Sequence, residues 1–164
     1  MPRPPVDPAA ATPPGLSLFT RLVIEVDPVV SLGGPARHGE RRFVTLRGGT
    51  AEGPGFEGTV LDGGVDWQVL RADGALDINA HYVLRSAGDG ALVEVQSEGV
   101  RHGPPEVMAA LARGEPVPAE AVYFRTAVRL TSGHPAWGHV NRTLFIATGQ
   151  REAARVRLDV WRVG

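Results

Sequence analysis

The stretch FEGTVLDGGVDWQVLRADGALDINAHYVLRSAGDGALVEVQS, from Phe56 to Ser97, decides the fold class. Apolar and polar residues alternate in it over short runs, which is the two-residue period of a β-strand. Three turns separate the runs: Asp62-Gly63-Gly64, Asp73-Gly74 and Gly88-Asp89-Gly90. Glycine and aspartate supply the positive-φ conformations that tight hairpins need. The stretch therefore predicts four antiparallel strands, at 56–61, 65–71, 76–85 and 91–97.

The same pattern continues on both sides of this stretch. Further strands are predicted at 18–26, 42–47, 122–130, 137–148 and 155–163. One short helix interrupts the series, because Pro104 and Pro105 favour a helix start and Gly114 favours a stop. Nine strands and one helix indicate an all-β sandwich or barrel. We favour a closed or nearly closed antiparallel β-barrel, since closure removes the exposed edges that promote aggregation.

The first fifteen residues, MPRPPVDPAAATPPG, lack any periodic apolar pattern. Proline removes a backbone donor and fixes φ, so this segment favours neither a helix nor a central strand. We interpret 1–15 as a disordered, Pro-rich tail and 16–164 as a single β-barrel domain. A chain of 164 residues can bury about two-thirds of its unfolded surface and needs no covalent staple.

The composition excludes several classes of chemistry. The chain has no cysteine, which rules out disulfides, iron–sulfur clusters, thiolate zinc sites and a cysteine nucleophile. All 17 basic residues are arginine, so no lysine is available as a base or for a Schiff base. The five histidines show no metal-binding spacing, and the glycine-rich segment at 48–55 lacks the lysine and the helix of a phosphate loop. We expect no cofactor and no metal.

Charge and hydropathy also restrict the partners. The net charge is −1 and the arginines are scattered, which argues against nucleic acid. No apolar run approaches the roughly 20 residues that span a bilayer, and prolines occupy the place of a signal peptide's apolar core. We expect a cytoplasmic protein that neither binds nucleic acid nor inserts into a membrane.

The position of a site depends on which strand faces line the barrel. On 76–85, for example, Leu76, Ile78 and Tyr82 share one face, whereas Asp77 and His81 share the other. If the apolar faces point inward, the barrel is filled and has no site. If the mixed faces point inward, seven polar residues converge on a cavity: Asp66, Asp77, His81, Tyr123, Arg125, His139 and Asn141. The sequence leaves both arrangements open.

Four residues are candidates for catalysis if a cavity exists. Asp66 or His139 can act as a general base or acid, and Tyr123 can donate a proton. Arg125 can stabilise a developing oxyanion, as can the Asn141 amide. Each has a structural alternative: Asp66 can cap its hairpin, and His139 can be a surface histidine beside an Asn141 that closes a turn.

Arg101 and Trp67 are candidates for binding a substrate. Arg101 can hold an anion or a carboxylate with its planar guanidinium, or can instead hold its own loop by bonding backbone carbonyls. Trp67, next to Asp66, can form a wall of the cavity, and Asn141 can contact the substrate if it does not close a turn.

Several segments resemble the DUF3237 family, also called UPF0311, of small bacterial and fungal proteins. The resemblance is carried by GGTAEGPGFEGTVLDGGVDW (Gly48 to Trp67), AHYVLRSAGDGALVEVQSEGVRHGPPEVM (Ala80 to Met108), YFRT (Tyr123 to Thr126), NRTLFIATGQRE (Asn141 to Glu152) and VRLDVWRV (Val156 to Val163). It implies a barrel of lipocalin-like appearance that is commonly oligomeric and has no established general activity.

The matching positions of that family include most of the candidate site. They are Asp66, Trp67, Tyr82, Arg101, Tyr123, Arg125 and Asn141. His139 departs from the pattern, because the family usually has an aromatic residue two positions before the asparagine. If this position lines the pocket, His139 adds a group that titrates near neutral pH.

These observations favour a cofactor-independent acid–base enzyme, such as an isomerase, cyclase, hydratase or lyase. Its substrate is expected to be an apolar aromatic or polyketide-like molecule bound in the barrel mouth. The alternatives are a non-catalytic carrier of small ligands and a structural oligomer with a filled core. A homodimer or higher oligomer is expected, because Trp161 and Val163 lie opposite Leu158 and Val160 and one chain cannot cover both faces.

Overall fold

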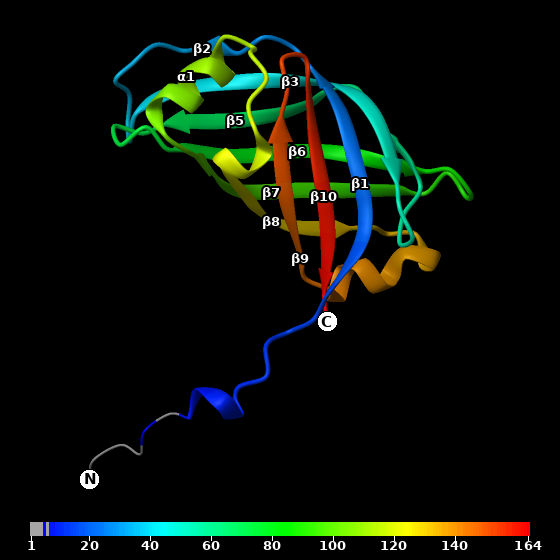
Figure 1. The fold of residues 1–164 in the computed structure, drawn as a ribbon. Coiled ribbons are helices and arrows are strands. Elements are labelled where there is room, and N and C mark those ends of the chain that lie inside the picture. Colours follow the sequence, from blue (N-terminus) through cyan, green and yellow to red (C-terminus); the bar gives the residue numbers. More distant parts are fainter. Residues whose placement is uncertain (1–4, 6) are drawn as a thin grey trace.

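The computed structural model describes residues 5 and 7–164, and strands dominate it (Figure 1). The ten strands are β1 (Leu16–Val26), β2 (Val30–Ser31), β3 (Glu40–Glu52), β4 (Gly58–Val60), β5 (Gly64–Leu70), β6 (Leu76–Ser86), β7 (Leu92–His102), β8 (Tyr123–Thr131), β9 (Phe145–Arg151) and β10 (Arg155–Val163). The helical elements are α1 (Pro105–Ala112) and the 3-10 helices η1 (Pro8–Ala10), η2 (Ala119–Ala121) and η3 (Pro135–Arg142).

Antiparallel pairing closes the strands into a barrel, as predicted. β1 pairs with β10 on one side and with β3 on the other, and the rest of the wall runs from β3 through β5, β6, β7, β8 and β9 to β10. β4 also lies between β3 and β6, so β4 and β5 form one interrupted strand of an eight-stranded, up-and-down wall. In Figure 1, β1, β9 and β10 cross in front of β5 to β8.

The apolar faces of the strands point into the barrel. On β6, Leu76, Ile78 and Tyr82 are buried, whereas Asn79 and His81 are exposed on the outer face. Of the two arrangements left open by the sequence, the structure therefore has the one with apolar faces inward. The expected consequence, a barrel without a polar interior, does not follow, because the inner faces of several strands become polar toward one end.

Aromatic side chains fill one end of the barrel, beside η3. The ring centroids of Phe19 and Phe145 are 4.8 Å apart, and those of Phe56 and Trp137 are 5.0 Å apart. Val140 of η3 is fully buried against this cluster. The sequence pattern predicted a strand over 137–148, and its first part is wrong. Pro135 begins a helical turn there instead, and Nδ1 of His134 caps it by accepting a hydrogen bond from the Ala136 amide.

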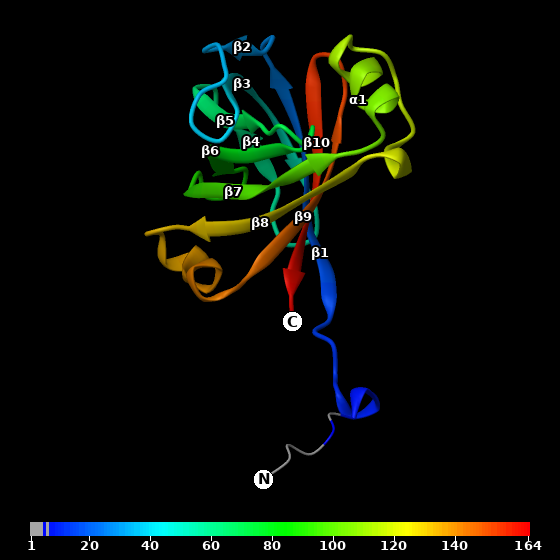
Figure 2. The same cartoon turned by 90° about the vertical axis from the view of Figure 1, so that its left-hand side faces the viewer.

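The opposite end of the barrel is covered by α1, as Figure 2 shows. The helix predicted after Pro104 is confirmed, and Leu111 is its one buried residue. Because Cβ atoms alternate across a strand, the inner residues at the carboxyl ends of β5, β7 and β9 meet the inner residues at the start of β3 at this end. That convergence creates the site described below.

The amino-terminal segment lies outside the barrel. Residues 1–4 and 6 of the predicted tail lie outside the described residues, whereas Pro5 and residues 7–15 are exposed. Within the described part of the chain, no helix has the length and apolar character needed to cross a membrane.

Candidate functional site

A small cavity inside the barrel lies next to a larger groove beneath α1. The inner cavity has a volume of about 40 Å³, close to the roughly 30 Å³ that one water molecule occupies in the liquid. The groove is about 810 Å³. Arg101 and Arg151 line both spaces, and Arg42 lines the groove. The body of a small organic ligand therefore fits the groove, and only a small polar group of it can reach inward past the arginines.

Asp66 provides the carboxyl group of this interior. It lies on β5 on the same inner face as Gln68. Nε2 of Gln68 donates a hydrogen bond to Oδ2 of Asp66 at 2.7 Å, and the Asn79 amide donates to Oδ1 at 3.2 Å. Burial raises the pKa of Asp66, and this effect outweighs the two hydrogen bonds and the nearby Arg101 and Arg42, which lower it.

Arg101 is the most deeply buried cation of the site. It is 8% exposed, and its guanidinium carbon lies 5.6 Å from the centroid of the Phe124 ring. Its buried Nε has no hydrogen-bond partner among the described residues. Burial lowers the pKa of Arg101 to about 10, with further contributions from the charges of Arg151 and Arg42. Arg101 is therefore still a cation at neutral pH, but an incompletely satisfied one.

Arg42 and Arg151 complete a cluster of three half-buried or buried arginines, here called the arginine triad. Nε of Arg42 donates to Oε1 of Gln68 at 2.9 Å, so Gln68 connects Arg42 to Asp66. Nη1 of Arg151 donates to the carbonyl oxygens of Glu152 at 2.5 Å and Arg155 at 3.1 Å. Burial is the main cause that lowers the pKa of both arginines.

Neutral polar groups surround the inner cavity. Tyr82 on β6 is buried, and burial followed by the charge of Asp66 raises the pKa of its phenol, so the hydroxyl stays protonated. Oγ of Ser97 donates to Oγ1 of Thr126 at 2.9 Å across β7 and β8. Together with Asp66 and the arginine triad, these groups give the inner cavity a hydrogen-bonding surface.

The structure brings Asp66, Tyr82 and Arg101 together but places Trp67, Tyr123 and Arg125 outside. Trp67 is 43% exposed beside Phe43 on the outer face, and Tyr123 is 49% exposed. The prediction that Asp66, Tyr123, Arg125 and His139 face one cavity is therefore wrong. On β8 the inward residues are Phe124 and Thr126, so the side chains alternating with them point to solvent.

Arg125 and Tyr123 contact each other on the outer surface. The guanidinium carbon of Arg125 lies 5.2 Å from the Tyr123 ring centroid, and its Nη1 donates to the Phe124 carbonyl at 2.9 Å. Both side chains therefore lie on the outer face of β8, on the side opposite the barrel interior.

His139 and Asn141 lie at the aromatic end of the barrel, in η3. The two residues would share a face in a strand, but both lie in a 3-10 helix, where residues two positions apart point in different directions. Asn141 closes a loop, because its Oδ1 accepts from the Ser132 amide at 2.9 Å and its Nδ2 donates to the Ser132 carbonyl at 2.8 Å. His139 is exposed, with its ring 5.7 Å from that of Trp137. Neither residue lines the inner cavity, so the structure does not bring them together with Asp66.

Three residues of the site were missed in the sequence: Arg42, Gln68 and Arg151. A signal exists for the two arginines, because Arg42 and Arg151 each continue an apolar inner face by steps of two, whereas Gln68 shares its face with Asp66. Arg151 follows Phe145, Ala147 and Gly149 on β9, and Arg101 follows Val93, Val95 and Ser97 on β7. A charged residue that extends a buried strand face marks a polar patch inside a barrel. Within residues 5 and 7–164, no group of three or more His, Cys, Asp or Glu side chains is placed to hold a metal ion.

Comparison with known proteins gives close relatives along nearly the whole chain. The model of a family described as "Protein of unknown function (DUF3237)" matches residues 14–163. A UPF0311 protein of Rhodopseudomonas palustris is 38% identical over 134 residues, which is 82% of this chain and 87% of the relative.

Solved structures share the barrel. The crystal structure of a conserved protein of unknown function from Rhodopseudomonas palustris superimposes with a TM-score of 0.87 at 34% identity, covering 94% of this chain and 99% of the other. A protein from Acinetobacter baumannii described as β-barrel-like gives 0.81 at 30% identity, with 94% and 98% covered. A chain from Penicillium herquei described as an enzyme gives 0.69 at 22% identity, with 94% and 97% covered, and shows the common fold alone.

Proposed function

The chain belongs to the DUF3237 family, whose function is unknown, and from its interior site we propose that it is a cofactor-independent acid–base enzyme. It binds a small apolar molecule, aromatic or polyketide-like, in the groove beneath α1 and moves a proton with Asp66. The reaction classes that fit are isomerisation, cyclisation, hydration and elimination.

The observation that carries this proposal is the Asp66 carboxyl group inside the barrel. A carboxyl that only holds strands together accepts hydrogen bonds in its ionised form and has a lowered pKa. At Asp66, burial raises the pKa instead, while Gln68 and the Asn79 amide fix the orientation of the carboxyl. General acids and bases are most effective when their pKa lies close to the working pH, and burial is how proteins achieve this for a carboxyl.

Tyr82 supplies the second group of the proposed mechanism. Its phenol is neutral and lines the same cavity. A neutral phenol can donate a hydrogen bond to an oxygen that gains negative charge when Asp66 removes a proton from a neighbouring carbon. Isomerisation, cyclisation and elimination next to a carbonyl all pass through such an enolate-like arrangement.

The chain from Penicillium herquei gives this proposal limited support. That protein is described as an enzyme and shares the barrel fold with this chain. Fold alone does not transfer an activity, so the proposal rests on Asp66 and its surroundings.

Deuterium exchange tests the proposal without knowledge of the natural substrate. The probes are 2-tetralone and 3-benzoylpropionate, two ketones that carry an aromatic ring and have exchangeable protons next to the carbonyl, observed by proton NMR in D₂O. The protein should accelerate exchange, and Asp66→Asn should lower the catalysed rate by about 10²-fold or more, the scale expected for losing a general base.

Asp77→Asn is the matched control for this experiment. Asp77 lies on the outer face of β6, where it forms an ion pair with Arg71 at 3.2 Å. This variant should exchange at the wild-type rate. If the Asp66→Asn variant also retains the full rate, Asp66 is not the base, and a carrier function replaces the enzyme.

A further inference from the structure

The α1 end of the barrel holds more positive than negative charge. The arginine triad faces the carboxyl group of Asp66. The other carboxyl groups nearby are Asp73, which lines the groove and is paired with Arg71, and Glu40, whose charge acts on Arg42. In the described part of the chain, none of the three arginines of the triad forms an ion pair within 4 Å, although nine such pairs occur elsewhere, mostly on the surface. Charge that is removed from water without a partner is costly, so this arrangement favours an anion from outside the chain.

Arg101 shows most directly where that anion belongs. It is buried, its Nε has no hydrogen-bond partner in the part of the chain that the structure describes, and the Phe124 ring supports one face of its guanidinium. Nη1 of Arg151 is already bonded to two backbone carbonyls. Arg101 instead leaves its buried Nε without a partner among the described residues, at the boundary between the inner cavity and the groove.

The shape of the surroundings selects the kind of anion. A guanidinium presents two parallel N–H donors, which match the two oxygens of a planar carboxylate. Apolar side chains line the groove next to the triad, including Leu70, Leu76, Met108 and Leu111. These side chains suit a ligand whose charged group is attached to an apolar body, rather than a free inorganic anion.

We propose that the arginine triad binds the carboxylate of an aromatic or polyketide-like acid, with Arg101 as the central contact and the apolar body of the ligand in the groove beneath α1. This inference rests on the proposed function, because it takes the ligand to be the substrate of the same site. It makes the substrate an organic acid and places the atoms next to its carboxylate beside Asp66.

Calorimetric titration with two matched probes tests this proposal. The probes are 2-naphthoate and 2-naphthamide, which share an aromatic body and differ in charge. The wild-type protein should bind 2-naphthoate at least 10-fold more tightly than 2-naphthamide. Arg101→Gln should weaken 2-naphthoate binding by 10-fold or more and leave 2-naphthamide binding unchanged. Arg101→Lys keeps the charge without the planar fork and should recover only part of the loss.

Arg125→Gln is the matched control, because Arg125 lies on the neighbouring strand but points outward; it should bind 2-naphthoate as the wild type does. Arg151→Gln, expected to weaken binding by a few-fold or more, provides a second test if the Arg101→Gln variant does not fold, as judged by circular dichroism. Equal affinity for the two probes, unchanged binding in the triad variants, or tighter binding of inorganic phosphate than of 2-naphthoate would each overturn the proposal.

Asp66→Asn separates this inference from the proposed function. This variant should bind 2-naphthoate at least as tightly as the wild type, because it removes a negative charge beside the triad. If binding depends on the triad but exchange does not depend on Asp66, the proposed enzyme function is wrong and the proposal of an organic-acid ligand stands. If exchange depends on Asp66 but binding does not depend on the triad, the proposed enzyme function stands and the arginine triad is not a carboxylate site.

Discussion

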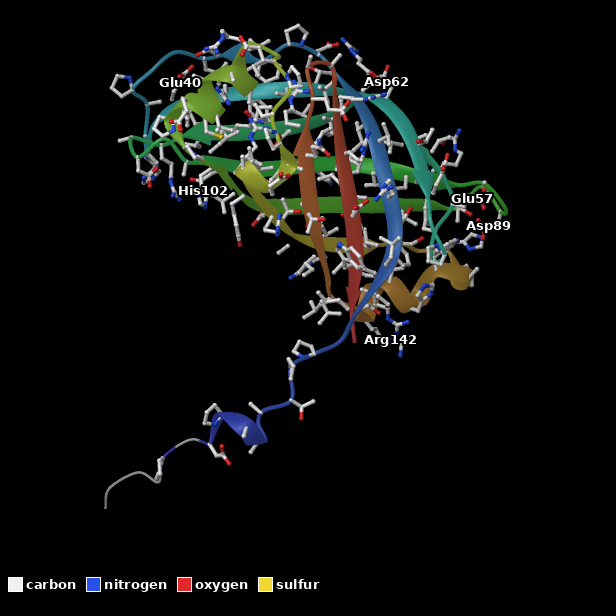
Figure 3. All side chains as sticks on the ribbon, viewed as in Figure 1. Glu40, Glu57, Asp62, Asp89, His102 and Arg142 are labelled. Carbon is white, nitrogen blue, oxygen red and sulfur yellow. The ribbon has the colours of Figure 1, made fainter. Side chains whose placement is uncertain are left out.

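The two ends of the barrel are built from the same strands but have opposite interiors. Toward η3, phenylalanine and tryptophan rings are in contact. Toward α1, the interior holds Asp66, Gln68 and the arginine triad around a cavity. Figure 2 shows η3 and α1 at these opposite ends. Figure 3 shows that exposed polar side chains occur at both: His102 on the α1 side, and Asp89 and Arg142 on the η3 side. The interiors alone distinguish the ends.

This difference indicates that stability and function are divided along the strands. On β9 the inner face begins with the fully buried Phe145 and ends with the half-buried Arg151. Packing of apolar groups stabilises a fold, whereas incompletely paired buried charges reduce stability and are tolerated where they serve a function. The aromatic end should therefore hold the barrel together, and the α1 end should be more stable without its charges.

The largest expected effect comes from the aromatic end. Phe145→Ala removes a ring that is 2% exposed and packs against Phe19, so it should lower the free energy of unfolding by about 3–5 kcal/mol. Urea denaturation followed by tryptophan fluorescence measures the change. Leu144→Ala is the control, because Leu144 is 70% exposed and its loss should cost no more than about 0.5 kcal/mol. Equal effects of the two variants would contradict the assigned role of this end.

A smaller effect is expected where the two regions meet, at Gly149. A Cβ at this position would lie 2.4 Å from the Phe124 ring, which in turn supports Arg101. Gly149→Ala should therefore displace the ring, lower the free energy of unfolding by about 1–3 kcal/mol and weaken binding of 2-naphthoate. Gly133→Ala, with open space around its Cβ, should change neither quantity. A Gly149→Ala variant with native stability and native binding would show that the ring is not fixed between the strand and Arg101.

Most of the fold could be predicted from the sequence, because alternation and turn chemistry are local signals. The glycine turn Asp73-Gly74 is a tight hairpin in the structure, with φ of +84° at Gly74. The error at 137–148 had a local cause as well. Trp137, His139 and Asn141 alternate with Gly138 and Val140 as in a strand, but Pro135 and the His134 cap select a helical turn.

The site could be predicted only in part, because a residue's face does not determine its surroundings. Alternation separates Asp66 from Trp67, but only closure of the barrel decides which of them is inside. Arg42 and Arg151 lie more than 100 positions apart in the chain and share a groove because alternate strands end at the same side of the barrel.

Self-association stays a prediction, and Leu144 and Ile146, exposed on the outer face of the wall, are consistent with it.

The pH dependence of stability tests the charged end through Asp66. Burial raises the pKa of Asp66 in the folded protein above its value in the unfolded chain, so ionisation favours the unfolded state. The free energy of unfolding of the wild type, relative to that of Asp66→Asn, should therefore be highest below about pH 4. It should fall as pH rises through the interval between the two pKa values, by up to about 1.4 kcal/mol for each pH unit. A difference that rises with pH would mean that the arginine triad stabilises the carboxylate more than burial penalises it.

Removal of the central charge should stabilise the protein. The pKa of Arg101 is lowered to about 10, below its ordinary value, so the fold disfavours the charged form and bears that cost at every pH below about 10. Arg101→Met fills a similar volume without charge and should raise the free energy of unfolding by about 1 kcal/mol, while abolishing 2-naphthoate binding. Arg85→Met, on the outer face of β6, should leave both unchanged. A clear loss of stability in Arg101→Met would assign Arg101 a structural role.

The smallest effect is expected from the amino-terminal tail, which leaves the barrel at the aromatic end in Figure 1. The last backbone contacts before β1 are those of Gly15, whose amide donates to the Gly164 carbonyl at 3.2 Å and whose carbonyl accepts from the Gly164 amide at 2.8 Å. Deletion of residues 1–14 keeps both bonds and removes no buried residue among those described. The free energy of unfolding, measured by thermal unfolding, should therefore change by no more than about 0.5 kcal/mol. Deletion through Leu18 is the matched comparison, because it also removes the pairing of Leu16 and Leu18 with Val163 and Trp161 and should destabilise the barrel measurably. If the shorter deletion is as harmful as the longer one, the tail contributes to the packing of the aromatic end, and that end is not closed by η3 and the barrel strands alone.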